Sequence, residues 1–336
     1  MTGVQTCALP ISMVFLYVVE HTMLPIIILV LIGFALDRRF GMDVKTLSKL
    51  LFYLIIPSFV FTNLFKTDFP PTGIPIISAV LFLMFIAFII ATIIGKLRHY
   101  DDCMMESCRN AIMFNNTGNL GIALVLLVFS HDPFVVNGQT PYLAEAMVTQ
   151  VMIFIIQNIS LNTLGLYQAG RGRLSVRSTL RVIFEMPIVY VVSAALIARY
   201  IGWDAQKFFF WPVMEMAGSA ILPVAMLAIG IQLSRTKIEW LDLDVWLASF
   251  IKLIVFPLLG LITVYTCNAI VPGTFSPVTS IVFVIYCSVP TAVNTAMYGI
   301  EFDNCPEYAT QVVMNTTILS AVTMTFFIFL GHLLFL

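Results

Sequence analysis

The sequence has 336 residues, of which 60% are hydrophobic and only 10% are charged, and its mean hydropathy is +0.98. Soluble globular domains carry roughly 25% charged residues, and an ordinary core cannot hold apolar runs of about 20 residues, the length that crosses a hydrocarbon layer. A soluble protein is therefore excluded, and the net charge of −1 gives no indication of nucleic-acid binding. We predict an all-α membrane protein.

Apolar runs separated by charged residues, glycine or proline predict about ten membrane-spanning helices. In chain order the expected spans are 16–36, 47–66, 74–95, 108–130, 143–167, 179–200, 212–234, 245–270, 278–299 and 309–334. The first span is the weakest because Glu20 and His21 lie near its start. The connections between spans are short, so no soluble catalytic or ligand-sensing domain is expected.

The first twelve residues (MTGVQTCALPIS) differ in character from the rest and look like the translation of a sequencing-library adaptor. We treat residues 1–12 as an adaptor-derived artefact and leave them out of fold reasoning. The six cysteines, which include Cys7, show no Cys-x-x-Cys pair and no histidine at ligand spacing. The sequence therefore predicts neither a metal site nor a disulfide framework.

Positive charges predict the orientation, because lysine and arginine collect on the cytoplasmic side of membrane proteins. Connections after the first, third, fifth and seventh spans carry 13 of the 17 such residues: Arg38, Arg39, Lys45, Lys49, Lys96, Arg98, Arg109, Arg171, Arg173, Arg177, Arg181, Arg235 and Lys237. The opposite side carries Lys66, Arg199 and Lys207. We expect a multi-pass protein of the cell (inner) membrane with both termini non-cytoplasmic and the loop around Arg173 inside.

The two halves of the chain resemble one another weakly. Pro25 and Pro187 lie at matching places in spans 1 and 6, as do Pro57 and Pro223 in spans 2 and 7. Because each half has an odd number of spans, the second copy inserts upside down, an arrangement common in secondary transporters. The expected division is a first five-helix repeat, a short cytoplasmic linker and a second five-helix repeat, at 13–167, 168–178 and 179–336. Coincidence is the alternative, since proline is frequent in membrane helices.

Spans 4 and 9, which correspond under this repeat, both look interrupted. Residues 114–121 (FNNTGNLG) hold polar groups that cannot lie against lipid, so this stretch must be buried in protein or line a wet cavity. Residues 287–295 (CSVPTAVNT) contain Pro290, which removes a backbone donor and breaks the helix. Two discontinuous helices at matching places predict a binding site near the middle of the membrane. The alternative is a pair of kinks at which asparagine side chains join helices.

Residues 116–122 (NTGNLGI) resemble the Asn-Thr-Gly-x-x-Gly-Ile/Leu-Pro motif of the auxin efflux carrier family, and residues 288–294 (SVPTAVN) resemble its span-9 motif. Further matches in spans 2, 7, 8 and 10 extend the resemblance over 13–336. The resemblance implies two inverted five-helix repeats with broken, crossing helices 4 and 9, similar to bile-acid sodium symporters and sodium/proton antiporters. Plant members export auxin, and bacterial relatives are associated with small carboxylates such as malate and malonate. The short linker makes this chain similar to the bacterial type. Ala123 departs from the motif's proline, which puts in doubt how sharply span 4 is broken.

The chemistry of an interrupted helix favours an anion, because the free N–H groups and the dipole of the second half-helix point at the break. Asn116 and Asn294 can donate amide N–H groups to a carboxylate. Lys252, within span 8, either extends its stem to the interface or supplies a counter-charge. The predicted substrate-binding residues are Asn116, Thr117, Gly118, Asn119, Gly121, Lys252, Pro290, Thr291, Asn294 and Thr295.

The sequence thus predicts a secondary active transporter of small organic anions, carboxylates above all, that works by alternating access and is not an enzyme. No cofactor is expected. A sodium-coupled organic anion symporter is one alternative, and a channel or membrane sensor is an alternative of another class. Proton coupling, with Glu215 as candidate, and a homodimer are left open. Polar side chains in span 5 are expected to form hydrogen bonds between helices: Gln150, Gln157, Asn158 and Asn162.

Overall fold

The computed structural model describes residues 20, 24–66, 73–170, 187–235 and 242–336. Within these ranges the named elements are all helices, which confirms the predicted all-α class. In chain order they are α2 (Leu24–Phe40), α3 (Val44–Leu50), η2 (Leu51–Ile55), α4 (Ile56–Lys66), α5 (Gly73–Leu97), α6 (Asp102–Met113), η3 (Thr117–Ile122), α7 (Ala123–Phe129), α8 (Leu143–Ser160), η4 (Leu161–Gly165), α9 (Leu166–Ala169), α11 (Pro187–Tyr200), η5 (Ala205–Lys207), α12 (Trp211–Ser219), α13 (Ile221–Arg235), α14 (Leu243–Phe250), η6 (Ile251–Val255), α15 (Phe256–Ile270), α16 (Pro277–Ser288), α17 (Val293–Glu301) and α18 (Pro306–Phe335).

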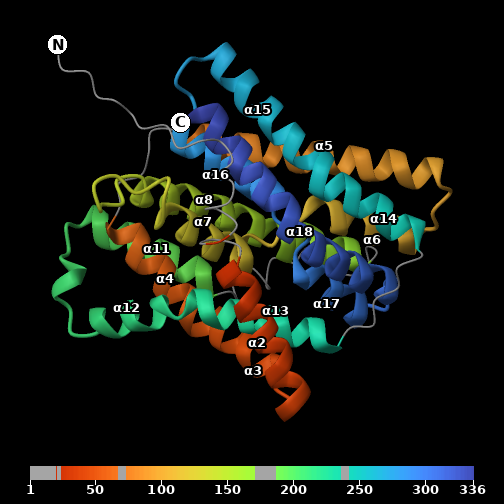
Figure 1. Cartoon of the computed structure of the whole chain (residues 1–336), viewed down its shortest axis with the longest axis horizontal. Helices are drawn as coiled ribbons and strands as arrows, with labels where there is room; N and C mark the ends of the chain where they lie inside the picture. Colours follow the sequence, from red (N-terminus) through yellow and green to blue (C-terminus); the bar gives the residue numbers. More distant parts are fainter. Residues whose placement is uncertain (1–19, 21–23, 67–72, 171–186, 236–241) are drawn as a thin grey trace.

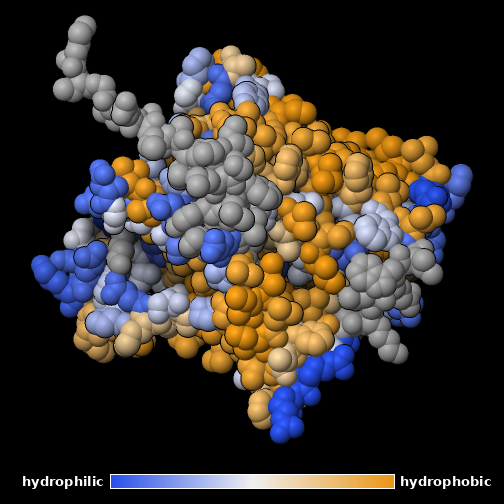
Figure 2. Space-filling model, viewed as in Figure 1, coloured by the Kyte–Doolittle hydropathy of each residue, from blue (hydrophilic) through white to orange (hydrophobic). Residues whose placement is uncertain are grey.

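Helices long and apolar enough to cross a membrane make up much of the fold. Five such runs lie in the described ranges: Gly73–Leu97, Leu143–Ala169, Trp211–Arg235, Leu243–Ile270 and Pro306–Phe335. Shorter apolar helices accompany them at Tyr53–Asn63, Thr117–Phe129, Tyr190–Tyr200 and Pro277–Ser288. Large apolar side chains such as Ile74 and Val322 face outward, and Figure 2 shows hydrophobic residues over most of the visible face, with hydrophilic residues towards its edges. Soluble proteins rarely expose so continuous an apolar surface.

One set of helices, α2, α4, α11, α12 and α13, forms what we call the small helix group, at the lower left of Figure 1. Within it, α2 packs against α13, and α4 packs against α11 and α12. Gly33 and Gly230 make the first contact possible, because a Cβ atom on either would overlap backbone atoms of the opposite helix. Small residues let membrane helices approach this closely. The ends of α2 and α13 are joined by Arg235, whose Nη2 atom lies 2.6 Å from Asp37 Oδ1.

The remaining long helices, α5 to α9 and α14 to α18, form the large helix group, which holds the candidate site. Its centre is α16, which packs against α8, α15 and α18 and is buried along nearly its whole length. A helix that is apolar all round belongs in such an interior position. At one end of the group, Arg98 and Tyr100 both bind the carboxylate of Asp244, at 2.9 Å and 2.7 Å, and thereby fasten the end of α5 to the start of α14.

The structure corrects the prediction on disulfides. Cys103 in α6 and Cys305, directly before α18, form a disulfide with their Cα atoms 5.8 Å apart, although 202 residues separate them in the sequence. The prediction rested on short spacings, and only the fold brings these two residues together. Cys108, Cys267 and Cys287 are free thiols.

Several predictions fall partly or wholly outside the described residues. Residues 1–12 and most of the linker 168–178, with the loop around Arg173, are among them. The division into 13–167 and 179–336, the count of ten spans and the orientation therefore stay predictions.

Candidate functional site

Two helices are interrupted, and their interruptions touch. Residues 114–116 separate α6 from η3, and residues 289–292 separate α16 from α17. The two extended stretches form an antiparallel bridge: the Asn116 N–H donates to the Pro290 carbonyl oxygen at 2.8 Å, and the Ala292 N–H donates to the Phe114 carbonyl oxygen at 3.0 Å. The predicted interruptions and their crossing are thereby confirmed.

The stretch after the first interruption differs from the prediction. Residues 116–121 were expected to unwind, whereas 117–122 forms the π-helical turn η3, in which the Gly121 N–H donates to the Asn116 carbonyl oxygen at 2.9 Å. Gly121 leaves room there for the Gln150 side chain, because a Cβ atom would lie 2.6 Å from Gln150 Nε2. Ala123 then continues the helix, since its N–H donates to the Leu120 carbonyl, a bond that the family's proline cannot make.

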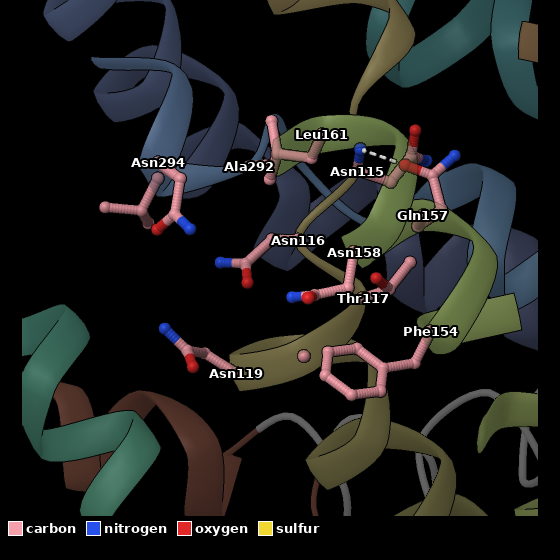
Figure 3. Close-up of a pocket in the computed structure, with 12 residues that line it drawn as sticks. Asn115, Asn116, Thr117, Asn119, Phe154, Gln157, Asn158, Leu161, Ala292 and Asn294 are labelled. Atoms are coloured by element: carbon pink, nitrogen blue, oxygen red, sulfur yellow. Dashed lines mark hydrogen bonds between the residues drawn. The ribbon is translucent and has the colours of Figure 1, made fainter. Parts of the chain in front are cut away.

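A cavity of about 30 Å³ lies beside the crossing (Figure 3). Its lining comes from the first interruption, the start of α17 and one face of α8. The lining residues are Asn115, Asn116, Thr117, Gly118, Asn119, Phe154, Gln157, Asn158, Leu161, Ala292, Val293 and Asn294. The volume admits about two water molecules, so a larger ligand requires the walls to move apart.

Asparagine side chains converge on this cavity. Figure 3 shows three amides projecting into one shared space: that of Asn116 from the interruption before η3, that of Asn119 from η3 and that of Asn294 from α17. Asn116 is only 5% exposed, and its Nδ2 atom has no hydrogen-bond partner among the described residues; the same holds for the buried Oδ1 atom of Asn119. A buried, unpaired polar group costs about 1–3 kcal/mol. These unpaired atoms leave one hydrogen-bond donor and one acceptor available at the cavity.

Helix N-termini add to the positive potential of the cavity. The first residues of η3, Thr117 and Gly118, and the first residues of α17, Val293 and Asn294, all lie in its lining. The first N–H groups of a helix have no partner within the helix, and the helix dipole places partial positive charge at the same end. Two such ends together with amide donors form a site suited to an anion.

Lys252 lies on the other side of the crossing, at the C-terminal end of α6. It belongs to the π-helical turn η6 and is completely buried. Its Nζ atom donates to the carbonyl oxygens of Ile112 and Phe114 at 2.8 Å and 3.1 Å and to Asn115 Oδ1 at 2.7 Å. Extension of this side chain to the membrane interface, one of the two predicted roles, is wrong. Lys252 also does not line the cavity, so its contact with substrate stays a prediction.

Four further predicted residues, Gly121, Pro290, Thr291 and Thr295, build the crossing and do not line the cavity. The Thr291 hydroxyl donates to the Ala111 carbonyl oxygen at 2.8 Å and so helps to cap α6. The Thr295 hydroxyl donates to a carbonyl oxygen three residues earlier, at 2.7 Å. Half of the predicted substrate-binding residues therefore line the cavity: Asn116, Thr117, Gly118, Asn119 and Asn294.

The sequence reasoning missed the wall that α8 and η4 provide. Phe154, Gln157, Asn158 and Leu161 follow one another at helical spacing, so they share one face, and that face lines the cavity. Gln157 also accepts from the Asn115 N–H at 3.3 Å (Figure 3). The predicted role of Gln157 in hydrogen bonds between helices is confirmed. The helical spacing of Phe154 and the polar pair Gln157–Asn158 is the sequence feature that could have predicted this wall.

An all-helical, multi-pass membrane protein in which a polar cavity adjoins two crossing, interrupted helices falls in the class of membrane transporters. The chain matches the membrane transport protein family over residues 18–328 and belongs to that family, which confirms the resemblance to auxin efflux carriers. A relative described as an uncharacterized transporter, from Methanothermobacter thermautotrophicus, is 23% identical over 319 residues, which cover 90% of this chain and 95% of the relative.

Proposed function

We propose that this transporter is a secondary carrier of small organic anions, carboxylates above all, which works by alternating access across the cytoplasmic membrane. One observation carries the proposal: the N-terminal ends of two half-helices line the same cavity as the Asn116 amide, which is buried and unpaired. These groups are hydrogen-bond donors, and the Asn116 amide has no partner in the described part of the chain.

The chemistry of the lining residues is suited to binding an anion with moderate affinity and then releasing it. Each charge-assisted hydrogen bond from Asn116 or Asn294 to a carboxylate is worth about 1.5–3 kcal/mol. The described lining residues include neutral amides, a hydroxyl and apolar groups, with no lysine, arginine or histidine among them. Donors without a full charge hold a carboxylate moderately, and a carrier needs moderate affinity because it must discharge its substrate on the far side.

The proposed movement is that of the large helix group against the small one. The boundary runs where α4 contacts α8 and where α13 contacts η3 and α7, so one side of the site region faces the small group. A cavity of about 30 Å³ does not hold an organic anion, and separation at this boundary would open it. The proposed architecture is ten spans in two inverted five-helix repeats, and the matching interruptions at α6–η3 and α16–α17 support it.

The proposed orientation, with both termini non-cytoplasmic, rests on the distribution of positive charges, whereas contacts between helix ends support only the order of the spans across the membrane. The Arg235–Asp37 pair joins the ends of spans 1 and 7, and the Arg98–Asp244 pair joins the end of span 3 to the start of span 8. Under the positive-charge rule all four of these helix ends belong on the cytoplasmic side. The pairs therefore bring together ends that the rule assigns to the same face.

The test is binding followed by flux. Purified protein would be screened by thermal shift against small carboxylates at two pH values, with and without sodium, using the neutral amide analogue of each hit as control. Each hit would then enter proteoliposomes preloaded with unlabelled compound. A carrier gives saturable uptake of label that is accelerated by the internal compound. Flux without this acceleration would instead indicate a channel, and binding without any flux would indicate a sensor.

A further inference from the structure

We propose that the Cys103–Cys305 disulfide is a reversible redox site, which a small thiol such as glutathione opens, and that the closed bond restrains α17, whose first residues line the cavity. This inference deepens the proposed function, on which it rests, because it concerns the regulation of the same site. Its consequence is a carrier whose cavity opens less readily when the surrounding thiols are oxidised.

The bond lies on the side of the membrane where disulfides do not usually persist. Cys103 is the second residue of α6, and Cys305 belongs to the connection between α17 and α18. In the proposed orientation both places are cytoplasmic, since the third connection is rich in positive charge. Glutathione and thioredoxin keep cytoplasmic thiols reduced, and the disulfides that do form there are usually transient and redox-sensing. Both cysteines are partly exposed, so the bond is not sealed in the interior.

The apolar packing of α17 is modest. Its buried residue Ala296 belongs to a small cluster with Ala309 and Val313 of α18, which is separate from the main core. Tyr298 packs against the main core but is only partly buried. Segments with little buried apolar surface are the ones that open most easily in a folded protein. A covalent bond next to the end of α17 is therefore an important part of what holds this helix in place.

The connection between α17 and α18 has an unfavourable backbone conformation. It comprises residues 302–305, and two of them, Asp303 and Cys305, have positive φ angles of 49° and 45°. Such angles are uncommon for residues that carry a Cβ atom, and they persist where the surrounding structure imposes them. The disulfide is one such constraint, because it fixes Cys305 to α6. Opening the bond therefore allows the connection to relax and α17 to move.

Movement of α17 matters because of what its other end carries. The helices α6, α17 and α18 pack against one another (Figure 1). The near end of α6 leads to Asn116, and α17 begins with Val293 and Asn294, so the bond joins the far ends of two half-helices whose near ends lie at the cavity. An organic anion needs more than the present volume of about 30 Å³. The walls must separate to admit it, and the reduced protein should allow this more readily.

The exchange balances with glutathione alone. In closing, the thiolate of one cysteine attacks a sulfur of oxidised glutathione, and one glutathione thiolate leaves and takes up a proton. The second cysteine thiolate then attacks the protein sulfur of this mixed disulfide, which forms the Cys103–Cys305 bond and releases the second glutathione. The protein loses two electrons and two protons, and oxidised glutathione gains both. Opening is the reverse reaction.

The first measurement is a redox titration of the purified full chain without substrate, with Cys7→Ser and Cys267→Ser as background. The protein is equilibrated with mixtures of reduced and oxidised glutathione, and its free thiols are counted by alkylation after unfolding. We expect the two thiols of Cys103 and Cys305 to appear towards reducing mixtures and to disappear towards oxidising ones. A bond that stays closed in excess reduced glutathione, or never forms in excess oxidised glutathione, would overturn the proposal.

The second measurement finds the side of the membrane from which the bond is opened. A reductant that cannot cross membranes is added to sealed vesicles of known orientation. It should open the bond in inside-out vesicles and leave it closed in right-side-out vesicles. Opening from the outer side alone would overturn the proposal, because a disulfide on that face is a permanent structural bond.

The third measurement compares α17 with and without the bond by hydrogen exchange. The double variant Cys103→Ser and Cys305→Ser and the reduced, unmodified protein should both lose protection of the α17 amides, while α15 stays protected. Both should also melt roughly 5–10 °C lower than the oxidised protein. The control Cys267→Ser removes a free thiol and should change neither result. Equal protection of α17 in the oxidised and reduced proteins would contradict the proposed restraint. Since no measurement uses substrate, failure here is separate from failure of the anion site, which is tested at Asn116.

Discussion

The two interrupted helices share one topology, but their first halves end in different ways. The end of α6 is capped by the buried ammonium of Lys252 and by the Thr291 hydroxyl. At the end of α16, the Tyr286 carbonyl accepts from the neutral amide of Asn115. Both second halves, by contrast, present N-terminal ends and asparagine side chains to the cavity. The comparison teaches that the C-terminal ends are fastened by the protein itself, one with a charge and one without, whereas the N-terminal ends are left for a ligand.

Loss of the charged cap should give the largest effect. Lys252→Met leaves the carbonyls of Ile112 and Phe114 without their donor in a buried place, and at about 1–3 kcal/mol for each unpaired group the free energy of unfolding should fall by about 2–6 kcal/mol. Chemical denaturation in detergent measures this loss. The same substitution at the exposed Lys207 should change little. Equal losses at the two positions would show that the charged cap contributes no special stability.

Loss of a neutral link on the α16 side should cost less. Gln157 Nε2 donates to the Tyr286 hydroxyl at 2.7 Å, and Gln157 Oε1 accepts from the Asn115 N–H. Gln157→Leu should therefore lower the free energy of unfolding by about 1–3 kcal/mol. A loss as large as that of Lys252→Met would remove the asymmetry between the two ends.

The N-terminal side can be disturbed through its glycine. Gly121→Ala places a Cβ atom 2.6 Å from Gln150 Nε2, so the end of this side chain must move and give up its hydrogen bond to the Thr117 carbonyl oxygen, at a cost of about 1–3 kcal/mol. Carboxylate affinity should fall with it, because this hydrogen bond holds the start of η3, which follows Asn116 and carries Asn119. Gly331→Ala is the matched control, since its nearest contact would be an ordinary 3.8 Å. Affinity that survives Gly121→Ala unchanged would argue that η3 does not shape the binding site.

The sequence predicted the helical membrane fold and the crossing because both leave marks in local composition. Asparagine and glycine at 115–121 are costly against lipid, and together with Pro290 at the matching place they favoured interruptions over simple kinks. Asn116 and Asn294 were assigned to the binding site because they match in the internal repeat and in the motifs of the family that the chain resembles.

Other features depend on neighbours that the sequence does not place. The sequence showed how deep Lys252 lies in its span, but it did not show that the end of α6 lies beside it. For that reason the prediction that this side chain extends to the membrane interface was wrong. Cys103 and Cys305 meet only through the packing of α6 and α18. The π-helical turn η3 reflects contacts with α8, such as that of Gln150 Nε2 with the Thr117 carbonyl oxygen at 3.0 Å.

The most direct test of the central claim is the affinity of a carboxylate, identified by the thermal-shift screen, for Asn116→Ala and Asn294→Ala. Each variant loses one charge-assisted donor, so binding should weaken roughly 10- to 100-fold, since 1.4 kcal/mol is tenfold. Asn116→Asp should be weaker still, because a carboxylate repels the anion. Asn63→Ala is the control, because the Asn63 amide donates to the Phe59 carbonyl oxygen of its own helix. Unchanged affinity in both cavity variants, with only their melting temperatures lowered, would show that these asparagines join helices and bind no substrate.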